Sequence, residues 1–366
     1  MLSPHEYESE MIYSGNRYII WKTGDTVISA ETLNYITGKL DELVMPRVTA
    51  IWGEWADVDQ NNKITLLFSR SINTENKATG FFNSDDLYSR DIDTASGAYN
   101  PYSNEADIIY LAAPEEGSDS SYSKETILAT IAHELTHVIN YTQKTYRNNE
   151  FIEEVFLDEG WSHLSENLCG LGISGGNIYF LEEYFRNTAN FSFCTANKSG
   201  QYDSAGMRGA MTLFLSYLFW KSGGMEIDNA GMGGVIDTGG IAFLKKMVGL
   251  EETGWTSIGT AYGNSIDDLF LEFSHDLNKN RINPEDFNYK TDPYTGEAIE
   301  FFSKMRIASD GTDRMVNPQI INTKITTLLP WSICYFEPLV LADSSRIKVK
   351  SESVSGSVFF NLLKGN

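Results

Sequence analysis

The chain reads AHELTHV at residues 132–138, inside a segment whose apolar residues recur at three- and four-residue intervals. This spacing predicts a helix over about residues 123–142, with Ser123 as its N-cap. Residues four apart on a helix lie about 40° from each other around its axis, so His133 and His137 point the same way. The pattern H-E-x-x-H on a helix is typical of zinc hydrolases, because two imidazoles on one face can share a metal ion.

The plainer interpretation of these histidines is that they are ordinary core or surface residues. The chain contains only five histidines, however, and two of them stand at ligand spacing around Glu134. This concentration of ligand types favours a metal site.

A catalytic zinc site usually takes three protein ligands and leaves a fourth position for water, so a further donor is needed. Residues 151–166 also read as a helix, and one of its stripes carries Glu159, His163 and Glu166. Charged side chains on a buried stripe need partners, and zinc accepts carboxylate ligands. We therefore predict Glu159 as the third ligand.

Neighbours of Glu159 offer alternatives. Asp158 lies about 100° from it around the helix and could instead hydrogen-bond a ligating histidine. His163 follows one turn later and could bind the metal itself or orient the glutamate. Glycine at position 160, inside the helix, lowers helix stability by about 1 kcal/mol relative to alanine. A close approach of another element at this position would explain why a glycine stands there.

Two stretches, HELTHVINY at residues 133–141 and FLDEG at 156–160, resemble the hyicolysin family of zinc metallopeptidases, a gluzincin-like group. The likeness covers about residues 49–224 and departs from the family at Thr136, where the family often has glutamine. It implies an α+β, zincin-like fold with a small mixed sheet, an active-site helix and a mostly helical second subdomain. It also implies a secreted or cell-surface enzyme that acts on proteins or peptides.

In the chemistry that we predict, His133, His137 and Glu159 hold Zn²⁺, which lowers the pKa of a bound water towards about 7. Glu134 takes the proton of that water and passes it to the leaving amine. By analogy with related enzymes, Tyr202 is a candidate to stabilise the tetrahedral intermediate, although a tyrosine before a helix more often only packs.

Two rival functions stay open. One is a zincin-like binding module without turnover, and the other is a zinc hydrolase that acts on a non-peptide amide. The intact H-E-x-x-H pattern argues against the first, because a purely structural zinc site has no use for the glutamate.

The composition excludes other partners. Fifty acidic and 28 basic residues among 366 give a formal charge of −22, which would repel nucleic acid and anionic membrane surfaces. No segment approaches the roughly 18 apolar residues of a membrane span. Residues 1–7 do not read as a signal segment, so we expect from the resemblance that one was removed. The sequence does not indicate an oligomeric state.

Three cysteines without a C-x-x-C pair indicate neither a cysteine zinc site nor a disulfide framework. A single bridge, for instance Cys169 to Cys194, stays open.

We predict three parts along the chain: residues 1–170 with both site helices, a mostly helical part at 171–282, and a small β-rich part at 283–366. Residues 79–100 are predicted to form a long loop over the cleft. Residues 106–112 read as a strand, which the resemblance would place at the sheet edge above the cleft, where an extended peptide could pair with it. The alternative is an interior strand with no role in substrate binding.

Asp57, Asp59 and Asn61 have the spacing of a calcium loop. An EF-hand, however, needs glycine where Asn62 stands and glutamate where Phe68 stands. We therefore predict a hairpin turn there, shaped by Asx side chains that bond their own backbone.

Overall fold

The computed structural model of the chain describes residues 6–91, 99–117, 121–147, 151–194, 201, 203–228, 234–282, 292–297, 299, 305–308, 313–316, 329 and 331–334. These residues divide into two compact units. The first unit comprises the described residues of Met1–Asn177, Leu218–Tyr262 and Tyr289–Glu300, and the second those of Ile178–Tyr217, Gly263–Asn288 and Phe301–Asn366. The three-part division that the sequence predicts stays a prediction.

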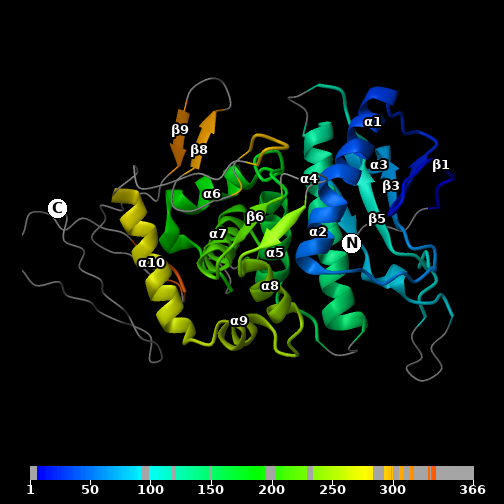
Figure 1. Cartoon of the computed structure of the whole chain (residues 1–366). Helices are drawn as coiled ribbons and strands as arrows, with labels where there is room; N and C mark the ends of the chain where they lie inside the picture. The colour runs from blue at the N-terminus through cyan, green and yellow to red at the C-terminus, as the bar shows by residue number, and fades with distance from the viewer. Residues whose placement is uncertain are drawn as a thin grey trace, which may run out of the picture. The chain divides into compact units, whose positions relative to one another are not determined.

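The first unit is built around a five-stranded sheet with the strand order β1-β2-β3-β5-β4 (Figure 1). The strands are β1 (Ser9–Ser14), β2 (Tyr18–Thr23), β3 (Ile64–Ser69), β4 (Gly80–Phe82) and β5 (Ile108–Ala112). The three central strands are parallel, and β1 and β4 are antiparallel to their neighbours. Ile20, Leu66 and Ile109 pair in register across the central strands and are fully buried, as expected of a parallel sheet that is covered on both faces.

The strand expected at the sheet edge lies inside the sheet. β5 is paired on both sides, with β3 and with β4, so the edge prediction for residues 106–112 is wrong. The edge strand beside β5 is β4, which falls in the stretch predicted as a loop at 79–100. A strand of three residues is too short to show an alternating pattern, and its pairing with β5 is a tertiary effect.

The turn predicted at residues 57–62 is confirmed, but it connects a helix to β3 and is not part of a hairpin. Asp57 Oδ1 accepts hydrogen bonds from the backbone N–H groups of Asn61 and Asn62 at 2.9 and 3.0 Å. These are the Asx-type bonds expected from the sequence.

Helices cover this sheet. Residues 30–52 form α1 (Ala30–Lys39) and α2 (Met45–Trp52), which are joined by a π-helical turn, η1 (Leu40–Val44). The predicted helix at 123–142 is confirmed as α4 (Lys124–Tyr141), and its N-cap Ser123 accepts a hydrogen bond from the Thr126 N–H at 3.2 Å. α4 packs against α2, β4, β5 and the second site helix, α5 (Val155–Leu168).

The remaining elements of the first unit are short. They are α3 (Arg70–Glu75), η2 (Ser84–Leu87), η3 (Thr142–Tyr146), β6 (Met225–Ile227), β7 (Val235–Asp237), α8 (Gly240–Val248) and α9 (Gly254–Tyr262). Arg47 of α2 is fully buried, pairs with Asp292, and donates to the Leu168 carbonyl at 3.0 Å, so it ties α2 to the end of α5.

The second unit is mostly helical. It contains α6 (Asn177–Arg186), η4 (Thr188–Asn190), most of α7 (Ala205–Lys221) and α10 (Ile266–Ile282), and the antiparallel strands β8 (Met305–Ala308) and β9 (Asp313–Val316). Phe193, Phe214 and Phe273 form its aromatic core, with ring centroids 5.0 to 5.9 Å apart. Most of the β-rich part predicted at 283–366 lies outside the described residues. The helices and the small mixed sheet confirm the α+β class.

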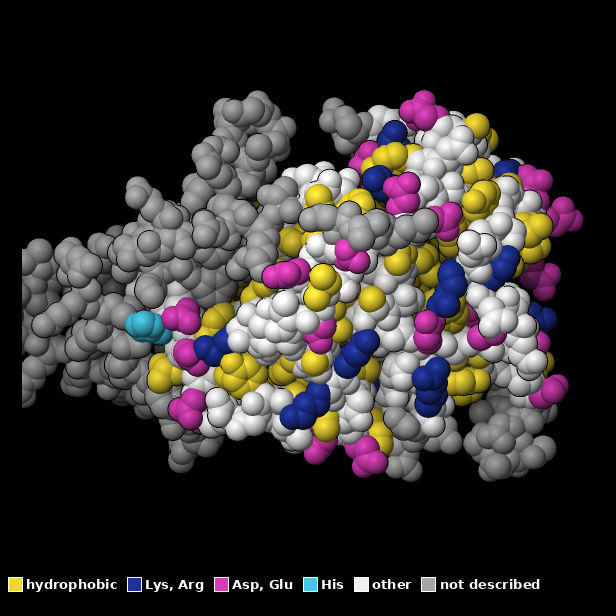
Figure 2. All heavy atoms as spheres, viewed as in Figure 1, with side chains coloured by type: hydrophobic (Ala, Val, Ile, Leu, Met, Phe, Trp, Pro, Cys, Tyr) yellow, Lys and Arg dark blue, Asp and Glu magenta, His cyan; other side chains and the backbone are white. Residues whose placement is uncertain are grey.

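Acidic and basic side chains of the described residues are interspersed on the face in Figure 2. Among the described residues, no helix combines the length and apolar character needed to cross a membrane. Cys169 is buried with a free thiol, so the bridge to Cys194 does not form. Burial raises the pKa of this thiol to about 12, which makes it unreactive at neutral pH.

Candidate metal site

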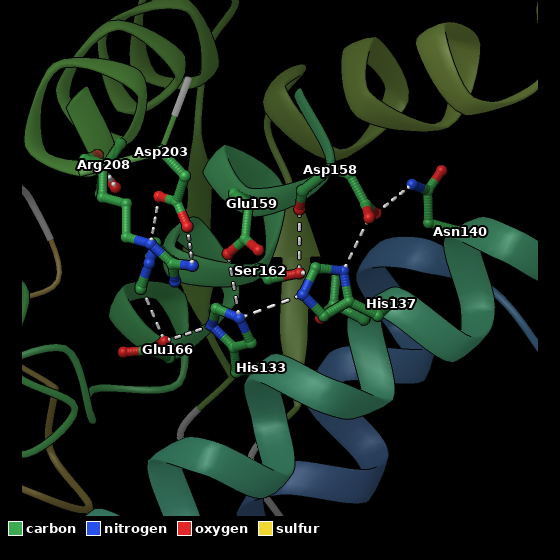
Figure 3. Close-up of polar contacts among 12 residues, drawn as sticks. His133, His137, Asn140, Asp158, Glu159, Ser162, Glu166, Asp203 and Arg208 are labelled. Carbon is green, nitrogen blue, oxygen red and sulfur yellow. Dashed lines mark hydrogen bonds and ion pairs between the residues drawn. The ribbon is translucent and has the colours of Figure 1, made fainter. Parts of the chain in front are cut away.

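α4 and α5 pack against each other and carry every described residue of the candidate site (Figure 3). His133 and His137 lie one turn apart on α4, with Glu134 beside the first of them. α5 supplies Glu159 and, on the following turns, further polar side chains. Local sequence places these groups, because the i, i+4 spacing puts both imidazoles on one face of α4.

Thr136 explains how the two helices are held together. Its hydroxyl lies 2.7 Å from Ser165 Oγ on α5, and Trp52 Nε1 of α2 donates to the same oxygen at 2.5 Å. Thr136 is fully buried, and its hydroxyl also donates to the Ala132 carbonyl at 2.8 Å. The residue that departs from the resembled family therefore serves helix packing.

Three donor atoms converge on one point between the helices. Nε2 of His133 lies 3.1 Å from Nε2 of His137 and 3.5 Å from Oε2 of Glu159. The ligand atoms of the three residues all lie within 4.8 Å of one another. Two atoms bonded tetrahedrally to zinc at 2.0–2.1 Å are roughly 3.3 Å apart, so the separations of 3.1 and 3.5 Å suit two ligands of one zinc ion.

The other nitrogen of each imidazole faces an acceptor. His133 Nδ1 lies 2.6 Å from Glu166 Oε1, and His137 Nδ1 lies 3.0 Å from Asp158 Oδ2. Ser162 Oγ, 3.2 Å from His137 Nδ1, donates its own proton to the Asp158 carbonyl, so it can only accept from the imidazole. Both rings must therefore carry a proton on Nδ1.

This tautomer assignment has a direct consequence for the metal. With Nδ1 protonated, each neutral ring presents the lone pair of Nε2, and the two lone pairs meet 3.1 Å apart. Such an arrangement is repulsive unless a proton or a metal ion lies between the nitrogens. Asp158 is held in turn by Asn140, whose Nδ2 donates to Oδ1 at 2.6 Å. A carboxylate that fixes a ligating histidine is a recurring feature of zinc sites.

His163 belongs to a different cluster. Its Nδ1 lies 2.9 Å from the same Glu166 Oε1 that faces His133, and its ring stacks edge-on against His133 with centroids 4.6 Å apart. His133, His163 and Glu166 also lie close enough to share an ion. The side chains of His163 and Glu166 are each only 4 % exposed, whereas Glu159 is 20 % exposed. Of these two clusters, the one with Glu159 is the more accessible to solvent, as a catalytic metal with a bound water requires.

The site is rich in negative charge. Burial lowers the pKa of His133, but hydrogen bonds with Glu159 and Glu166 outweigh burial and raise it to about 10. Burial likewise lowers the pKa of His137, and the Asp158 carboxylate more than reverses this effect. The carboxylates around the two rings therefore favour a positive charge at the imidazoles, which a proton or a metal ion can supply.

Glu134 differs from the other carboxylates. It is 8 % exposed, and burial raises its pKa, although His133 and His137 act in the opposite direction. A carboxyl group whose pKa is raised towards neutrality is suited to accept and return a proton. Tyr202, the fifth site residue that the sequence predicts, lies outside the described residues.

Sequence reasoning anticipated some of these partners. The sequence offers Asp158 as a group that could hydrogen-bond a histidine, and in the structure it faces His137. The sequence indicates only that Glu166 lies on a buried stripe and needs a partner, and the structure brings it to two imidazoles. His163 Nδ1 lies 2.9 Å from Glu166 Oε1, so this histidine helps to orient that carboxylate.

Comparison with known proteins gives one relevant relative. The chain is 27 % identical over 163 residues to the neutral metalloprotease ShpI of Staphylococcus hyicus. The match covers 44 % of this chain and 36 % of the relative, so it spans about a third of that protein's length. No protein-family model matches the chain.

Proposed function

We propose that the chain is a zinc-dependent endopeptidase. The partial similarity to a neutral metalloprotease supports metal-dependent proteolysis in general. The observation that carries the finer proposal is the meeting of two imidazole lone pairs and the Glu159 carboxylate at one point, with both Nδ1 atoms engaged elsewhere. Nitrogen and oxygen donors in this number and spacing suit zinc.

In this proposal His133, His137 and Glu159 bind the metal. Zinc bound there would acidify a water molecule and polarise the carbonyl of the scissile peptide bond. Glu134 accepts the proton of the attacking water on its carboxylate and returns it to the leaving nitrogen. Glu166 and Asp158 keep the two rings in the tautomer and orientation that present Nε2.

Three further expectations belong to the proposal. Tyr202 would hydrogen-bond the developing oxyanion, the fold would be zincin-like, and the protein would be secreted. The resemblance of residues 133–141 and 156–160 to hyicolysin-type peptidases supports these expectations. Protein or peptide is the proposed substrate.

Metal analysis with a cleavage screen tests the proposal. We expect about one zinc per purified chain and cleavage of a diverse peptide library that 1,10-phenanthroline abolishes and added zinc restores. Zinc without any cleavage would support a binding module or a non-peptide amidase instead. Absence of zinc from protein refolded with an excess of the metal would refute the ligand assignment.

The variant Glu134→Gln tests the general base. It removes the proton acceptor but leaves all three metal ligands, so we expect unchanged zinc content and peptide hydrolysis lower by about 10²–10⁴-fold. Glu125→Gln, in the first turn of the same helix, is the matched control and should retain full activity. Unchanged turnover in Glu134→Gln would exclude this residue as the base.

A further inference from the structure

A second group of acidic side chains lies in the first unit at the start of β3. Asp57 and Asp59 belong to the turn that precedes this strand, and Asp107 immediately precedes β5. The backbone pairing of the two strands brings them together, because the Thr65 N–H donates to the Asp107 carbonyl at 2.9 Å. One carboxylate oxygen from each of the three aspartates lies within 4.8 Å of the others.

Asp107 is the informative member of this cluster. Its side chain is fully buried, and Oδ1 accepts a hydrogen bond from the Val58 N–H at 3.2 Å. Oδ2 is also buried and accepts no hydrogen bond from any residue that the structure describes. A buried carboxylate oxygen without a partner is costly, so this atom requires a proton or a cation.

The surroundings of Asp107 make the cost larger. Burial is the main reason that its pKa is raised to about 7, and the carboxylates of Asp59 and Asp57 add to the effect. Folding therefore places the buried Asp107 carboxylate beside two other negative charges. A bound cation would satisfy Oδ2 and neutralise the mutual repulsion of the three groups.

The geometry also accounts for the failed match to a calcium loop. Asp57, Asp59 and Asn61 have the oxygen spacing of the first half of such a loop, but Phe68 replaces the glutamate that ends it. Asp107, from a neighbouring strand, supplies a carboxylate in place of that glutamate. Asn62 adopts φ 59°, the left-handed conformation that glycine provides in EF-hands.

We propose that Asp57, Asp59 and Asp107 bind a calcium ion that links the turn before β3 to the start of β5. Three carboxylates without a nitrogen or sulfur donor favour a hard cation over zinc. Calcium is favoured over magnesium because a turn and a strand end form an irregular, adaptable oxygen site, whereas magnesium needs near-ideal octahedral geometry. Asp59 is exposed, so an ion can enter from solvent.

Calorimetry and thermal unfolding of the full, zinc-loaded chain test the site. Protein that has been treated with EGTA, separated from the chelator and reloaded with one zinc per chain should bind one Ca²⁺ per chain. At 100 times the dissociation constant, Ca²⁺ should raise the melting temperature by roughly 5–10 °C. Mg²⁺ at the same concentration should give a much smaller rise. No rise with Ca²⁺, or an equal rise with Mg²⁺, would overturn the proposal.

Two variants and a control locate the ion. Asp59→Asn and Asp107→Asn should each weaken calcium binding by at least about tenfold, because each removes one charged ligand. Asp85→Asn removes an exposed carboxylate outside the cluster and should bind calcium as the wild type does. Calcium affinity that is unchanged in both cluster variants would place the ion elsewhere.

Asp107→Asn also separates calcium binding from a merely structural role. Without calcium at pH 8, this variant should melt at a higher temperature than the wild type, since it removes a buried charge while an amide oxygen can still accept from the Val58 N–H. If Asp107 served only to bond the backbone, the variant would gain nothing and calcium would still stabilise it. Asp59→Asn, at an exposed position, gives an answer even if Asp107→Asn does not fold.

Discussion

The Glu166 carboxylate, which contacts no metal in the proposed site, should nevertheless control zinc affinity. Its Oε1 faces His133 Nδ1 at 2.6 Å and His163 Nδ1 at 2.9 Å, and its pKa is lowered because the two imidazoles outweigh the effect of burial. We therefore predict that Glu166→Gln weakens zinc binding although all three ligands remain. The glutamine keeps the shape of the side chain and one acceptor oxygen, but it loses the charge.

The size of the effect follows from the hydrogen bond between His133 and Glu166. A hydrogen bond to a charged group contributes about 1.5–3 kcal/mol, and one between neutral groups about 0.5–1.5 kcal/mol. The substitution therefore removes roughly 1–1.5 kcal/mol from the bond that reaches a metal ligand. At 1.36 kcal/mol for each factor of ten, zinc affinity should fall about 5- to 13-fold.

Asp158→Asn provides the comparison, because Asp158 has the same relation to His137. Its side chain is 36 % exposed and Ser162 also faces the same Nδ1, so solvent and the hydroxyl reduce the loss. We expect a loss of less than about threefold for this variant. Competition against a zinc-binding dye at pH 7.5, with circular dichroism to check folding, measures both variants. Affinity within twofold of the wild type for Glu166→Gln, or a larger loss for Asp158→Asn, would refute the reasoning.

Three further predictions concern the buried charges of the first unit. Lys144→Met should lower the free energy of unfolding, measured by urea denaturation, by about 3–5 kcal/mol. The buried Lys144 lies 3.0 Å from Glu153, and its loss leaves that carboxylate without a positive partner. A loss below about 1 kcal/mol would contradict this. Gly175→Ala should weaken zinc binding about as much as Glu166→Gln, because the added methyl group would overlap the Glu166 carboxylate; unchanged affinity would show that the carboxylate can move without consequence. In zinc-free protein, His133 has a folded-state pKa of about 10, above the value of 6.5 for an unfolded histidine. Protonation of His133 therefore stabilises the folded state fully below about pH 6.5, and this stabilisation is lost as the pH rises to about 10. The melting temperature of the zinc-free protein, relative to that of the zinc-loaded protein, should therefore fall over this range, and a constant difference would argue against it.

The sequence predicted the parts of the site that depend on one helix. Spacing on a helix is fixed at about 3.6 residues per turn, so His133 and His137 could be placed on one face before any tertiary contact was known. The confirmed span of α4, capped by Ser123, shows that apolar periodicity and a capping side chain were sufficient here. The prediction that Glu159 is the third ligand depends on the ligand types that zinc accepts. Its carboxylate lies near His133 because of the way α5 packs against α4, which the sequence alone does not show.

Pairings across the fold could not be predicted in the same way. Glu166 meets His133 only because α4 and α5 pack with particular rotations about their own axes, and periodicity does not report those rotations. The edge strand β4 has three residues, and it pairs antiparallel with β5, a strand well separated from it in the sequence, so no local pattern reports the pairing.

The aspartate cluster shows what this distinction means for function. Residues 57–68 lack the glycine and the glutamate that an EF-hand needs at Asn62 and Phe68, so this segment alone predicts a turn without calcium. The strand pairing between β3 and β5 brings Asp107 to the turn across a separation that no loop motif covers. A metal site assembled from one segment can be recognised by its spacing, whereas the site that we propose here is completed by a distant residue and is indicated by a buried carboxylate oxygen that no described residue satisfies.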